Sequence, residues 1–308
     1  MKILVTGGAG FIGQNLIKKI IDEHEIIVID DFSSGQLKNL SNFTKQIRVI
    51  SQDICNQISV SVDAIYNLAC PASPKQYQSN PVQTMRSSVI GVGNLLELAR
   101  TSNIRILQSS TSEIYGDPEI SPQEETYWGR VNPVGIRSCY DEGKRAAETM
   151  FVDYHLQYEV DTRIARIFNT YGPGLHKNDG RVVSNFITQA LRDEDLTIYG
   201  DGTQTRSFCF VDDLIEGLVK LFEYEGEDSY LPMNLGNPQN INMLELANLV
   251  IELTDSKSKI DFLPLPTDDP RQRTPDISRA MKLLNWEPKV DLTLGIKETI
   301  EYFRFQDR

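Results

Sequence analysis

Two polar side chains near the middle of the chain have the types and the spacing needed to move a proton. Tyr140 and Lys144 are four residues apart, so on a helix they lie one above the other on the same face. An ammonium group lowers the pKa of a tyrosine, which otherwise titrates at about 10 and is no base at neutral pH. Such a pair can take a proton from a sugar hydroxyl while a cofactor takes the hydride. The spacing alone is equally typical of an ordinary helix surface.

A glycine-rich turn near the N-terminus predicts a site for a pyrophosphate group. The apolar run 2–6 is followed by a G-x-x-G-x-x-G spacing and then by a helical pattern. In a strand–turn–helix unit, bare backbone N–H groups and the positive end of the helix dipole face the anion. The residues that we expect to contact a dinucleotide here are Gly7, Gly10, Phe11, Ile12 and Gly13.

The acids that follow the second predicted strand indicate which dinucleotide binds. That strand covers 25–29 and ends at Asp30, with Asp31, Ser34 and Gly35 beyond it. An acid at this position bonds the 2′-hydroxyl of the adenosine ribose, whereas a 2′-phosphate would be repelled. We therefore predict NAD and not NADP. A structural βαβ unit with an acid there by chance is the alternative.

Strands and helices alternate through the first half, which predicts a doubly wound parallel sheet, the α/β Rossmann fold. Further strands are expected at 47–51, 64–69, 104–108 and 162–167, with helices at 82–101 and 140–156. Ligands of such sheets bind at the carboxyl ends of the strands. There we place four more cofactor contacts: Asp53, Ile54, Leu68 and Ala69. Asp53 could equally cap a turn.

After residue 170 the chain becomes rich in turns and its predicted elements become short. We expect residues 1–170 to form the Rossmann domain and residues 171–308 a smaller α/β lobe that binds the substrate. Within the second part, the predicted helix 210–224 and strand 233–235 indicate that 208–236 returns to the first domain. A helix at 243–253 and a proline-rich connector, 263–275, complete the lobe.

Composition excludes several classes of protein. The sequence has 308 residues and a net charge of −12, which argues against binding to nucleic acid or to an anionic membrane. No apolar run is long enough to span a bilayer, and the first strand begins at Lys2, so we expect no signal peptide. Neither the four cysteines nor the three histidines (His24, His155, His176) show metal spacing; we take the histidines as structural or solvent-facing. We predict reduced thiols, no metal and a cytoplasmic location.

The glycine turn, the Ser-Ser-Thr stretch 109–111 and Tyr-x-x-x-Lys resemble the extended short-chain dehydrogenase/reductase family, which modifies nucleotide sugars. Longer motifs narrow the resemblance to its UDP-glucuronate decarboxylases and cover nearly the whole chain. These motifs are NLACPASP (67–74), STSEIYGDP (110–118), YWGRVNP (127–133), RIFNTYGP (166–173), DGRVVSNF (179–186), GDGTQTRSF (200–208), DDP (268–270) and RTPDI (273–277), with Gly295 and YFR (302–304) near the end.

The resemblance implies the roles of the catalytic residues. Thr111 lies beside the sugar 4-position, Tyr140 is the base, and Lys144 tunes the base and binds the nicotinamide ribose. Glu113 and Arg273 resemble the pair near the sugar carboxylate. Related dehydratases carry Asp-Glu after the threonine, whereas this chain has Ser112-Glu113. Oxidation at C4 of a glucuronate gives a β-keto acid, which loses CO2 because the ketone takes up the electrons as an enolate.

The resemblance also implies a substrate site in the C-terminal lobe. Guanidinium groups suit diphosphate and carboxylate oxygens, although each arginine alone could be an ordinary surface residue. Arg86 stands where family members usually have lysine, and 175–177 also depart from the usual pattern. The substrate-binding candidates are Arg86, Ser112, Asn169, Arg181, Tyr199, Arg206 and Arg273.

The expected activity is therefore NAD-dependent conversion of UDP-glucuronate to UDP-xylose and CO2, in a homodimer paired through the helices that begin near 82 and 140. One alternative is a decarboxylase that releases the UDP-4-keto-pentose. A second is a nucleotide-sugar 4-epimerase or 4,6-dehydratase. A third, from a different class, is a non-catalytic NAD-binding regulator on the same fold.

Overall fold

Seven parallel strands form the central sheet of the protein, whose computed structural model describes residues 1–264 and 272–306. Their order is β11-β6-β5-β4-β1-β2-β3. Strands β1 to β3 are therefore added towards one edge of the sheet and β4 onwards towards the other, so the strand order reverses between β1 and β4. Ligands of doubly wound sheets bind in the crevice at such a reversal. The strands are β1 (Lys2–Thr6), β2 (Glu25–Asp30), β3 (Ile47–Ser51), β4 (Ala64–Asn67), β5 (Arg105–Thr111), β6 (Thr162–Ile167) and β11 (Met233–Leu235).

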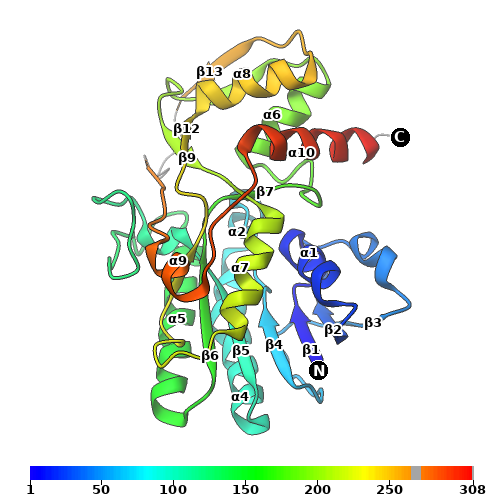
Figure 1. Ribbon diagram of the computed structural model, residues 1–308, viewed down its shortest axis with the longest axis vertical. Coiled ribbons are helices and arrows are strands. Elements are labelled where there is room, and N and C mark those ends of the chain that lie inside the picture. The colour runs from blue at the N-terminus through cyan, green and yellow to red at the C-terminus, as the bar shows by residue number, and fades with distance from the viewer. Residues whose placement is uncertain (265–271, 307–308) are drawn as a thin grey trace.

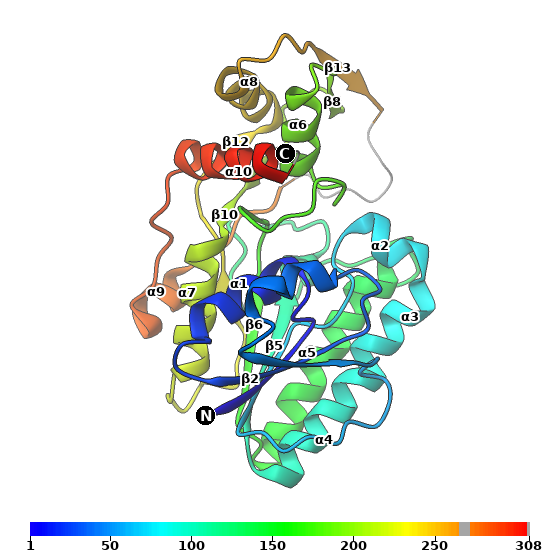
Figure 2. The same cartoon turned by 90° about the vertical axis from the view of Figure 1, so that its right-hand side faces the viewer.

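Helices cover both faces of this sheet, as the doubly wound pattern requires. One face carries α1 (Phe11–Ile20) and α7 (Val211–Glu223), and the other carries α4 (Val92–Ser102) and α5 (Ser138–Tyr158) (Figures 1 and 2). Because successive strand residues point to opposite faces, Ile3 and Val5 of β1 pack with α1 and α7, whereas Leu4 packs with α4 and α5. Both faces are therefore buried, which explains the apolar strands.

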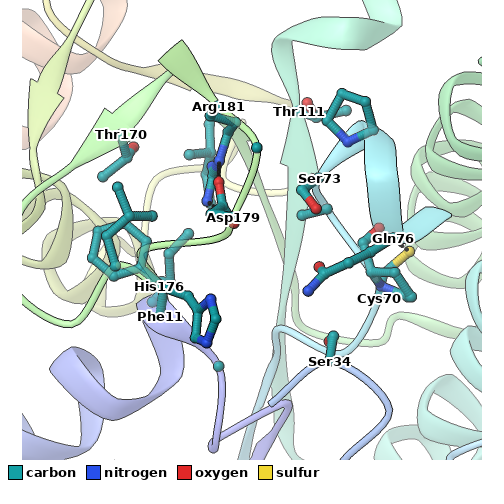
Figure 3. Close-up of a pocket in the computed structure, with 18 of the residues that line it drawn as sticks. Phe11, Ser34, Cys70, Ser73, Gln76, Thr111, Thr170, His176, Asp179 and Arg181 are labelled. Atoms are coloured by element: carbon teal, nitrogen blue, oxygen red, sulfur yellow. Dashed lines mark hydrogen bonds and ion pairs between the residues drawn. The ribbon is translucent and has the colours of Figure 1, made fainter. Parts of the chain in front are cut away.

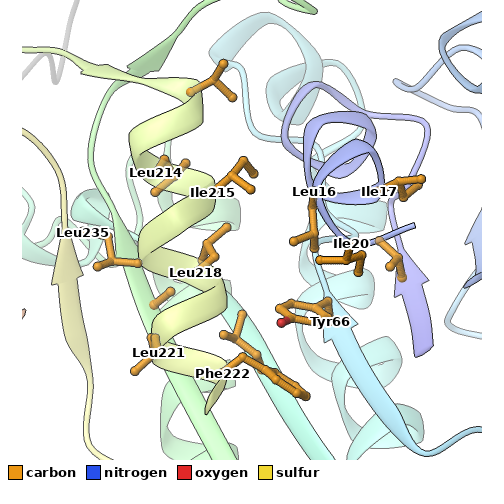
Figure 4. Packing of buried hydrophobic residues seen from close by; sticks show 14 of the residues in the cluster. Leu16, Ile17, Ile20, Tyr66, Leu214, Ile215, Leu218, Leu221, Phe222 and Leu235 are labelled. Atoms are coloured by element: carbon orange, nitrogen blue, oxygen red, sulfur yellow. The ribbon is translucent and has the colours of Figure 1, made fainter. Parts of the chain in front are cut away.

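The contact between α1 and α7 forms the centre of the first core. Leu16 and Ile20 of α1 face Leu218 of α7, and the ring of Tyr66 from β4 lies below them (Figure 4). Tyr66 in turn stacks on Phe222 at the end of α7, with ring centroids 4.3 Å apart. This packing fixes the glycine turn, because α1 begins directly after it.

A smaller lobe lies beyond the carboxyl ends of the strands (Figure 1). Its core is formed by apolar side chains of three helices and a short strand, among them Phe186, Ile198, Leu246 and Phe303. The elements of the lobe are α6 (Val182–Leu191), β8 (Leu196–Tyr199), β9 (Thr205–Ser207), β12 (Asn240–Asn242), α8 (Met243–Thr254), β13 (Ile260–Leu263) and α10 (Leu292–Gln306). Strands β8 and β13 pair in parallel, and β9 and β12 pair antiparallel.

Short elements connect these parts, and some of them contribute residues to the cleft described below. They are η1 (Leu37–Phe43), α2 (Pro74–Ser79), α3 (Pro81–Arg86), η3 (Ser112–Tyr115), β7 (Thr170–Tyr171), β10 (Cys209–Phe210) and α9 (Ser278–Leu284). A single π-helical turn, η2 (Ser87–Gly91), joins α3 to α4. The helix expected at 82–101 is thus three consecutive helical segments.

The structure differs from the expected domain boundary in one segment. Ile277 and Leu284 pack in the core of the large domain and not in the lobe, as does Trp286, whose Nε1 donates a hydrogen bond to the Asp213 carbonyl oxygen at 2.9 Å. The chain therefore returns to the sheet a second time after 208–236, before α10 completes the lobe. The 268–270 motif and part of the 263–275 connector lie outside the described residues.

Two further observations concern classes of protein. Within residues 1–264 and 272–306, no helix combines the length and the apolar character needed to cross a bilayer. The same residues contain no cluster of three or more His, Cys, Asp or Glu side chains suited to a metal ion.

Candidate active site

One cleft of about 570 Å³ lies between the carboxyl ends of the strands and the lobe. Residues of the glycine turn and of the sheet form one side, and residues of the lobe form the other. Figure 3 shows the two walls, with Arg181, Asp179 and Thr170 facing Thr111 and Ser73. Every candidate named from the sequence lines this cleft except Arg86.

The glycine turn has the shape that a pyrophosphate group requires. Gly7 has a φ of +68°, and a Cβ there would lie 2.8 Å from the carbonyl of Leu68. A Cβ on Gly13 would lie 2.3 Å from the Gly7 carbonyl oxygen, so α1 can approach the turn only with glycine there. At Gly10 a Cβ would meet only the Gly7 oxygen, at 3.2 Å, and Gly10 lines the cleft, as Phe11 and Ile12 do. No side chain caps the start of α1, so its first N–H groups suit an anion.

Asp30 is held rigidly at the end of β2. Its Oδ2 accepts a hydrogen bond from the Ala9 N–H at 2.9 Å and its Oδ1 accepts one from the Phe32 N–H at 2.8 Å. Burial raises the pKa of Asp30, although these two N–H groups lower it. Asp31, Ser34 and Gly35 line the same end of the cleft. Two adjacent acids suit a ribose hydroxyl and not a 2′-phosphate, so these residues fit NAD.

Asp53 caps a turn and also lines the cleft, so its cofactor contact stays a prediction. Its Oδ1 accepts a hydrogen bond from the Cys55 N–H at 2.8 Å, which caps a turn, and its Oδ2 accepts one from Gln83 Nε2 at 2.8 Å. It also lines the cleft, together with Ile54, Leu68 and Ala69. The turn cap thus orients a carboxylate that remains available to a ligand.

The Tyr140 ring is packed between two other side chains. Tyr77 of α2 stacks on it with centroids 4.9 Å apart and planes 4° from parallel, and Lys144 Nζ lies 5.8 Å from its centroid. Lys144 Nζ also donates a hydrogen bond to the Ser109 carbonyl oxygen at 2.8 Å, which fixes the ammonium group at the end of β5. Thr111, at the end of the same strand, lies near enough to the phenol for its hydroxyl to lower the pKa of Tyr140. The expected grouping of Thr111, Tyr140 and Lys144 is therefore present.

The sequence predicted that Lys144 lowers the pKa of Tyr140, but in the protein alone that pKa is raised. Burial raises the pKa of Tyr140 well above its ordinary value, and the nearby Thr111 hydroxyl lowers it only in part. Burial also lowers the pKa of Lys144, because an ammonium group is disfavoured away from water. The i, i+4 spacing predicts proximity correctly, but it cannot predict burial.

Glu113 lies between two arginines. Arg273 donates from Nη1 to Oε1 at 2.6 Å and from Nη2 to Oε2 at 2.8 Å, and Arg137 donates from Nη2 to Oε2 at 2.7 Å. Burial acts to raise the pKa of Glu113, but the charges and hydrogen bonds of the two arginines outweigh it and hold that pKa below its usual range. Glu113 is thus a carboxylate at neutral pH and orients both guanidinium groups.

Arg273 is held in place by the backbone on either side of it. Its carbonyl oxygen accepts a hydrogen bond from Ser207 Oγ at 3.2 Å, and the next N–H, of Thr274, donates to Gln123 Oε1 at 2.8 Å. Thr274 Oγ1 donates to Asn240 Oδ1 at 2.7 Å. These contacts join strands β9 and β12 of the lobe to the loop after β5, so Arg273 faces the catalytic residues.

The lobe contributes the other candidates for substrate binding. Arg181 forms an ion pair with Asp179, which leaves the guanidinium group facing the cleft (Figure 3). Arg206, on β9, is 8% exposed and lines the same wall. Asn169 and Tyr199 lie there too, and Ser112 lies beside Glu113 at the start of η3. Two cationic groups on one wall suit a diphosphate.

The prediction for Arg86 is wrong. Arg86 ends α3 with its side chain exposed and does not line the cleft, whereas Ser87, one residue later, does. The motif position shows that this segment lies near the site. It does not show which side chain faces the cleft, because successive residues of a helix point about 100° apart.

The structure also adds residues that the sequence did not indicate. Tyr77 and Arg137 contact the catalytic groups, and Asp179 pairs with Arg181. Extending the Tyr140 helix one turn backwards would have reached Arg137, and the DGR motif contains Asp179 beside Arg181. No sequence signal marks the stacking of Tyr77. His176, expected to be structural or solvent-facing, is exposed and lines the cleft.

Comparisons with known proteins identify the class that this fold and this cleft define. The family model described as GDP-mannose 4,6 dehydratase matches residues 4–299. Among solved structures, UDP-glucose 4-epimerase of Thermotoga maritima, with UDP-glucose, is 29% identical with a TM-score of 0.92, and each chain is covered completely. UDP-glucuronic acid 4-epimerase of Bacillus cereus, in complex with UDP-glucuronic acid and NAD, is 27% identical with a TM-score of 0.86, over 99% of this chain and 100% of that one.

Curated relatives narrow the class further. UDP-glucuronic acid decarboxylase 6 of Arabidopsis thaliana is 53% identical over 99% of this chain and 90% of its own length. UDP-glucuronic acid decarboxylase 1 of Danio rerio is 50% identical over 98% of this chain and 72% of its own length. The chain therefore belongs to the extended short-chain dehydrogenase/reductase family of nucleotide-sugar enzymes, and within it to the UDP-glucuronic acid decarboxylases.

The two glycines of the turn provide a matched test of the cofactor site. We expect Gly10→Ala to fold normally but to bind NAD at least about tenfold more weakly, a loss of about 1.4 kcal/mol, because Gly10 lines the cleft and an added methyl group would crowd the pyrophosphate site. Gly13→Ala should instead destabilise the fold, since its methyl group would collide with backbone atoms. Thermal melting and NAD titration separate the two effects. Unchanged NAD affinity in Gly10→Ala would contradict this placement of the cofactor.

Proposed function

We propose that this protein converts UDP-glucuronate to UDP-xylose and CO2, with NAD as a cofactor that is regenerated in each cycle. The observation that carries the proposal is the position of Arg273, which pairs with Glu113 in the same cleft as Thr111, Tyr140 and Lys144. The first group, Thr111, Tyr140 and Lys144, can support oxidation of a sugar hydroxyl. The second group, Arg273 with Glu113, presents a cation to a carboxylate. The identity of 50–53% with UDP-glucuronic acid decarboxylases supports it.

The first group acts on the hydroxyl at C4 of the sugar. Thr111 at the end of β5 and Tyr140 of α5 both line the cleft, and the Thr111 hydroxyl lies near the phenol, so both can contact one hydroxyl group of a ligand. NAD, when bound along the glycine turn, accepts a hydride and later returns it, and its oxidised ring brings a positive charge into the cleft. Lys144 holds a second positive charge beside Tyr140. Tyr140 takes the hydroxyl proton in the forward step and gives it back in the last.

The second group acts on the carboxylate. Arg273 lines the cleft, and its Nε is buried without a hydrogen-bond partner among the described residues. It can therefore orient the carboxylate of the 4-keto acid while Glu113 and Arg137 keep it in position. The bond from C5 to the carboxylate breaks, CO2 leaves, and the electron pair passes to the 4-ketone as an enolate. The enolate takes a proton from solvent at C5, and the 4-ketone would then take back the hydride held by NAD and the proton held by Tyr140, which completes UDP-xylose.

The diphosphate binds on the opposite wall. Arg181 and Arg206 face the cleft there, with Asn169 and Tyr199 beside them. This arrangement holds the uridine diphosphate in the lobe and leaves the sugar between the lobe and Tyr140. A global charge of −12 makes these local cations the principal attraction for an anionic substrate.

Mass spectrometry of the products from UDP-glucuronate tests the proposal. We expect loss of CO2 and a product with the mass of UDP-xylose. A product two hydrogens lighter would mean that the 4-keto-pentose is released, and an unchanged mass would favour a 4-epimerase.

In Arg273→Gln we expect the KM for UDP-glucuronate to rise about tenfold or more, because a charged hydrogen bond contributes about 1.5–3 kcal/mol. Binding of UDP-glucose, which has no carboxylate, should change little and is the control.

The Tyr140→Phe variant separates an enzyme from a regulator. We expect kcat to fall by about 10²- to 10⁴-fold, because the proton acceptor is removed, while NAD remains bound. Tyr158→Phe, at the exposed end of the same helix, should keep full activity. If the parent protein binds NAD but turns over none of the UDP-sugars offered, the regulator becomes the better interpretation.

The location and the assembly belong to the same proposal. All four cysteines are free, which suits the reducing cytoplasm.

Val82 on α3 is 70% exposed and Ile90 on η2 is 41% exposed, so this helical face offers apolar contacts for a second copy of the chain. We expect sedimentation to show a dimer and Val82→Glu to shift it towards monomer. Leu294→Glu, at an exposed position of α10 in the lobe, is the control, and an equal shift there would argue against this interface.

A further inference from the structure

Gln123 is a buried residue outside the cleft, and its amide group is hydrogen-bonded at both ends. It lies in the loop between η3 and α5, is 0% exposed and does not line the cleft. Its Oε1 accepts a hydrogen bond from the Thr274 N–H at 2.8 Å, and its Nε2 donates one to the Ile120 carbonyl oxygen at 2.6 Å. Because Thr274 follows Arg273, this N–H belongs to the peptide group that joins those two residues.

The backbone of Gln123 adds to this contact. Its N–H donates to the Thr274 carbonyl oxygen at 2.8 Å, and its carbonyl oxygen accepts from the Asp276 N–H at 2.8 Å. The loop and the segment after Arg273 thus pair as a short parallel bridge, in which Gln123 lies opposite Pro275. These contacts fix the register of the chain directly after the arginine that is proposed to bind the sugar carboxylate.

The same junction is joined to the element that carries Glu113. Asn234 of β11 donates from Nδ2 to the carbonyl oxygens of Gln123 and Asp276, at 2.9 and 3.0 Å. Its Oδ1 accepts from the hydroxyl of Tyr115 at 2.8 Å, and Tyr115 ends η3, two residues after Glu113. The two segments that carry the ion pair are therefore held by one side chain of the central sheet.

We propose that Gln123 sets the position of Arg273 and thereby the preference of the cleft for nucleotide sugars that carry a carboxylate. Gln123 is a positioning residue, because it does not line the cleft and acts through the backbone of Thr274. The inference rests on the proposed function, since it requires Arg273 to bind the sugar carboxylate.

The orientation of the Arg273 guanidinium group matters as much as its charge, because such a group recognises a carboxylate through parallel N–H donors. At its outer end the group is oriented by Glu113, to which Nη1 and Nη2 donate at 2.6 and 2.8 Å. At its inner end the side chain starts from the backbone, which Gln123 holds on one side. Ser207 Oγ donates to the Arg273 carbonyl oxygen at 3.2 Å. A looser backbone would tilt the guanidinium group and leave its charge in the cleft.

Glutamine suits this position because its two contacts need opposite groups. The Thr274 N–H requires an acceptor and the Ile120 carbonyl oxygen requires a donor, and one amide supplies both. In Gln123→Met a side chain of similar length fills the space, but neither hydrogen bond can form and the buried Thr274 N–H loses this partner. In Gln123→Glu the acceptor remains and the donor is lost.

Titration with two nucleotide sugars measures the preference directly. In the NAD-bound Tyr140→Phe protein, which does not turn over, we expect Gln123→Met to weaken binding of UDP-glucuronate at least about fivefold and binding of UDP-glucose less than about twofold. A merely structural role would lower the Tm and weaken both ligands alike. Leu95→Ala, in the core beneath α4, is the control: it should lower the Tm and leave the ratio of the two affinities unchanged.

A double variant shows whether Gln123 acts through Arg273. Two residues that act through one contact are not additive, so Gln123→Met should change the ratio of affinities little further once Arg273→Gln is present. An additive loss in the double variant would mean that Gln123 acts by another route, and the proposal would be wrong.

The other outcomes are distinct. Equal weakening of both sugars by Gln123→Met, or an unchanged ratio of affinities, would overturn the assignment. If Arg273→Gln alone leaves the ratio unchanged, the proposed function of Arg273 fails instead. Should Gln123→Met not fold, Gln123→Glu decides: the affinity for UDP-glucuronate should fall at least about twofold relative to that for UDP-glucose, and an unchanged ratio would contradict the proposal.

Discussion

The buried ion cluster around Glu113 is the constraint on which the rest of the active site depends. Its three members come from distant parts of the chain: Glu113 in η3 after β5, Arg137 at the start of α5, and Arg273 just before α9. Removing one partner from such a cluster costs about 3–5 kcal/mol, because the charge left behind remains buried. The cluster therefore fixes how the lobe meets the sheet. It also fixes where Arg273 lies relative to Tyr140.

A second buried network, of hydrogen bonds between the sheet and α5, supports this arrangement. Arg166 of β6 donates from Nη2 to Glu148 Oε2 of α5 at 2.8 Å, and from Nη1 to the hydroxyl of Tyr115 at 2.9 Å. Tyr115 donates in turn to Asn234 Oδ1 on β11 at 2.8 Å. Because α5 carries both Glu148 and Tyr140, this network holds the catalytic helix against the sheet. Gly143 permits the close approach of α5 to η2, where a Cβ would lie 3.0 Å from Ser88 Cβ.

The sequence predicted those features that depend on local pattern. Apolar runs marked the strands, glycine spacing marked the turn, and motifs marked residues such as Arg273 that the fold brings to one cleft. It could not predict features that depend on the direction of a side chain or on burial. Arg86 is exposed although its neighbour Ser87 lines the cleft, Tyr77 stacks on Tyr140, and the return of 277–286 to the large domain follows from packing of Trp286.

The largest difference between pattern and structure concerns the electrostatics of Tyr140, and it has a chemical consequence. Burial raises the pKa of the phenol and lowers that of Lys144, so neither group is tuned by their spacing alone. A phenol that keeps its proton in the protein alone would act as a base only once bound oxidised cofactor brought positive charge beside it. Coupling the base to the hydride acceptor in this way would limit proton removal to the state in which the hydride can also leave. The burial of Tyr140, and not the charge of Lys144 alone, would then couple the proton transfer to the hydride transfer.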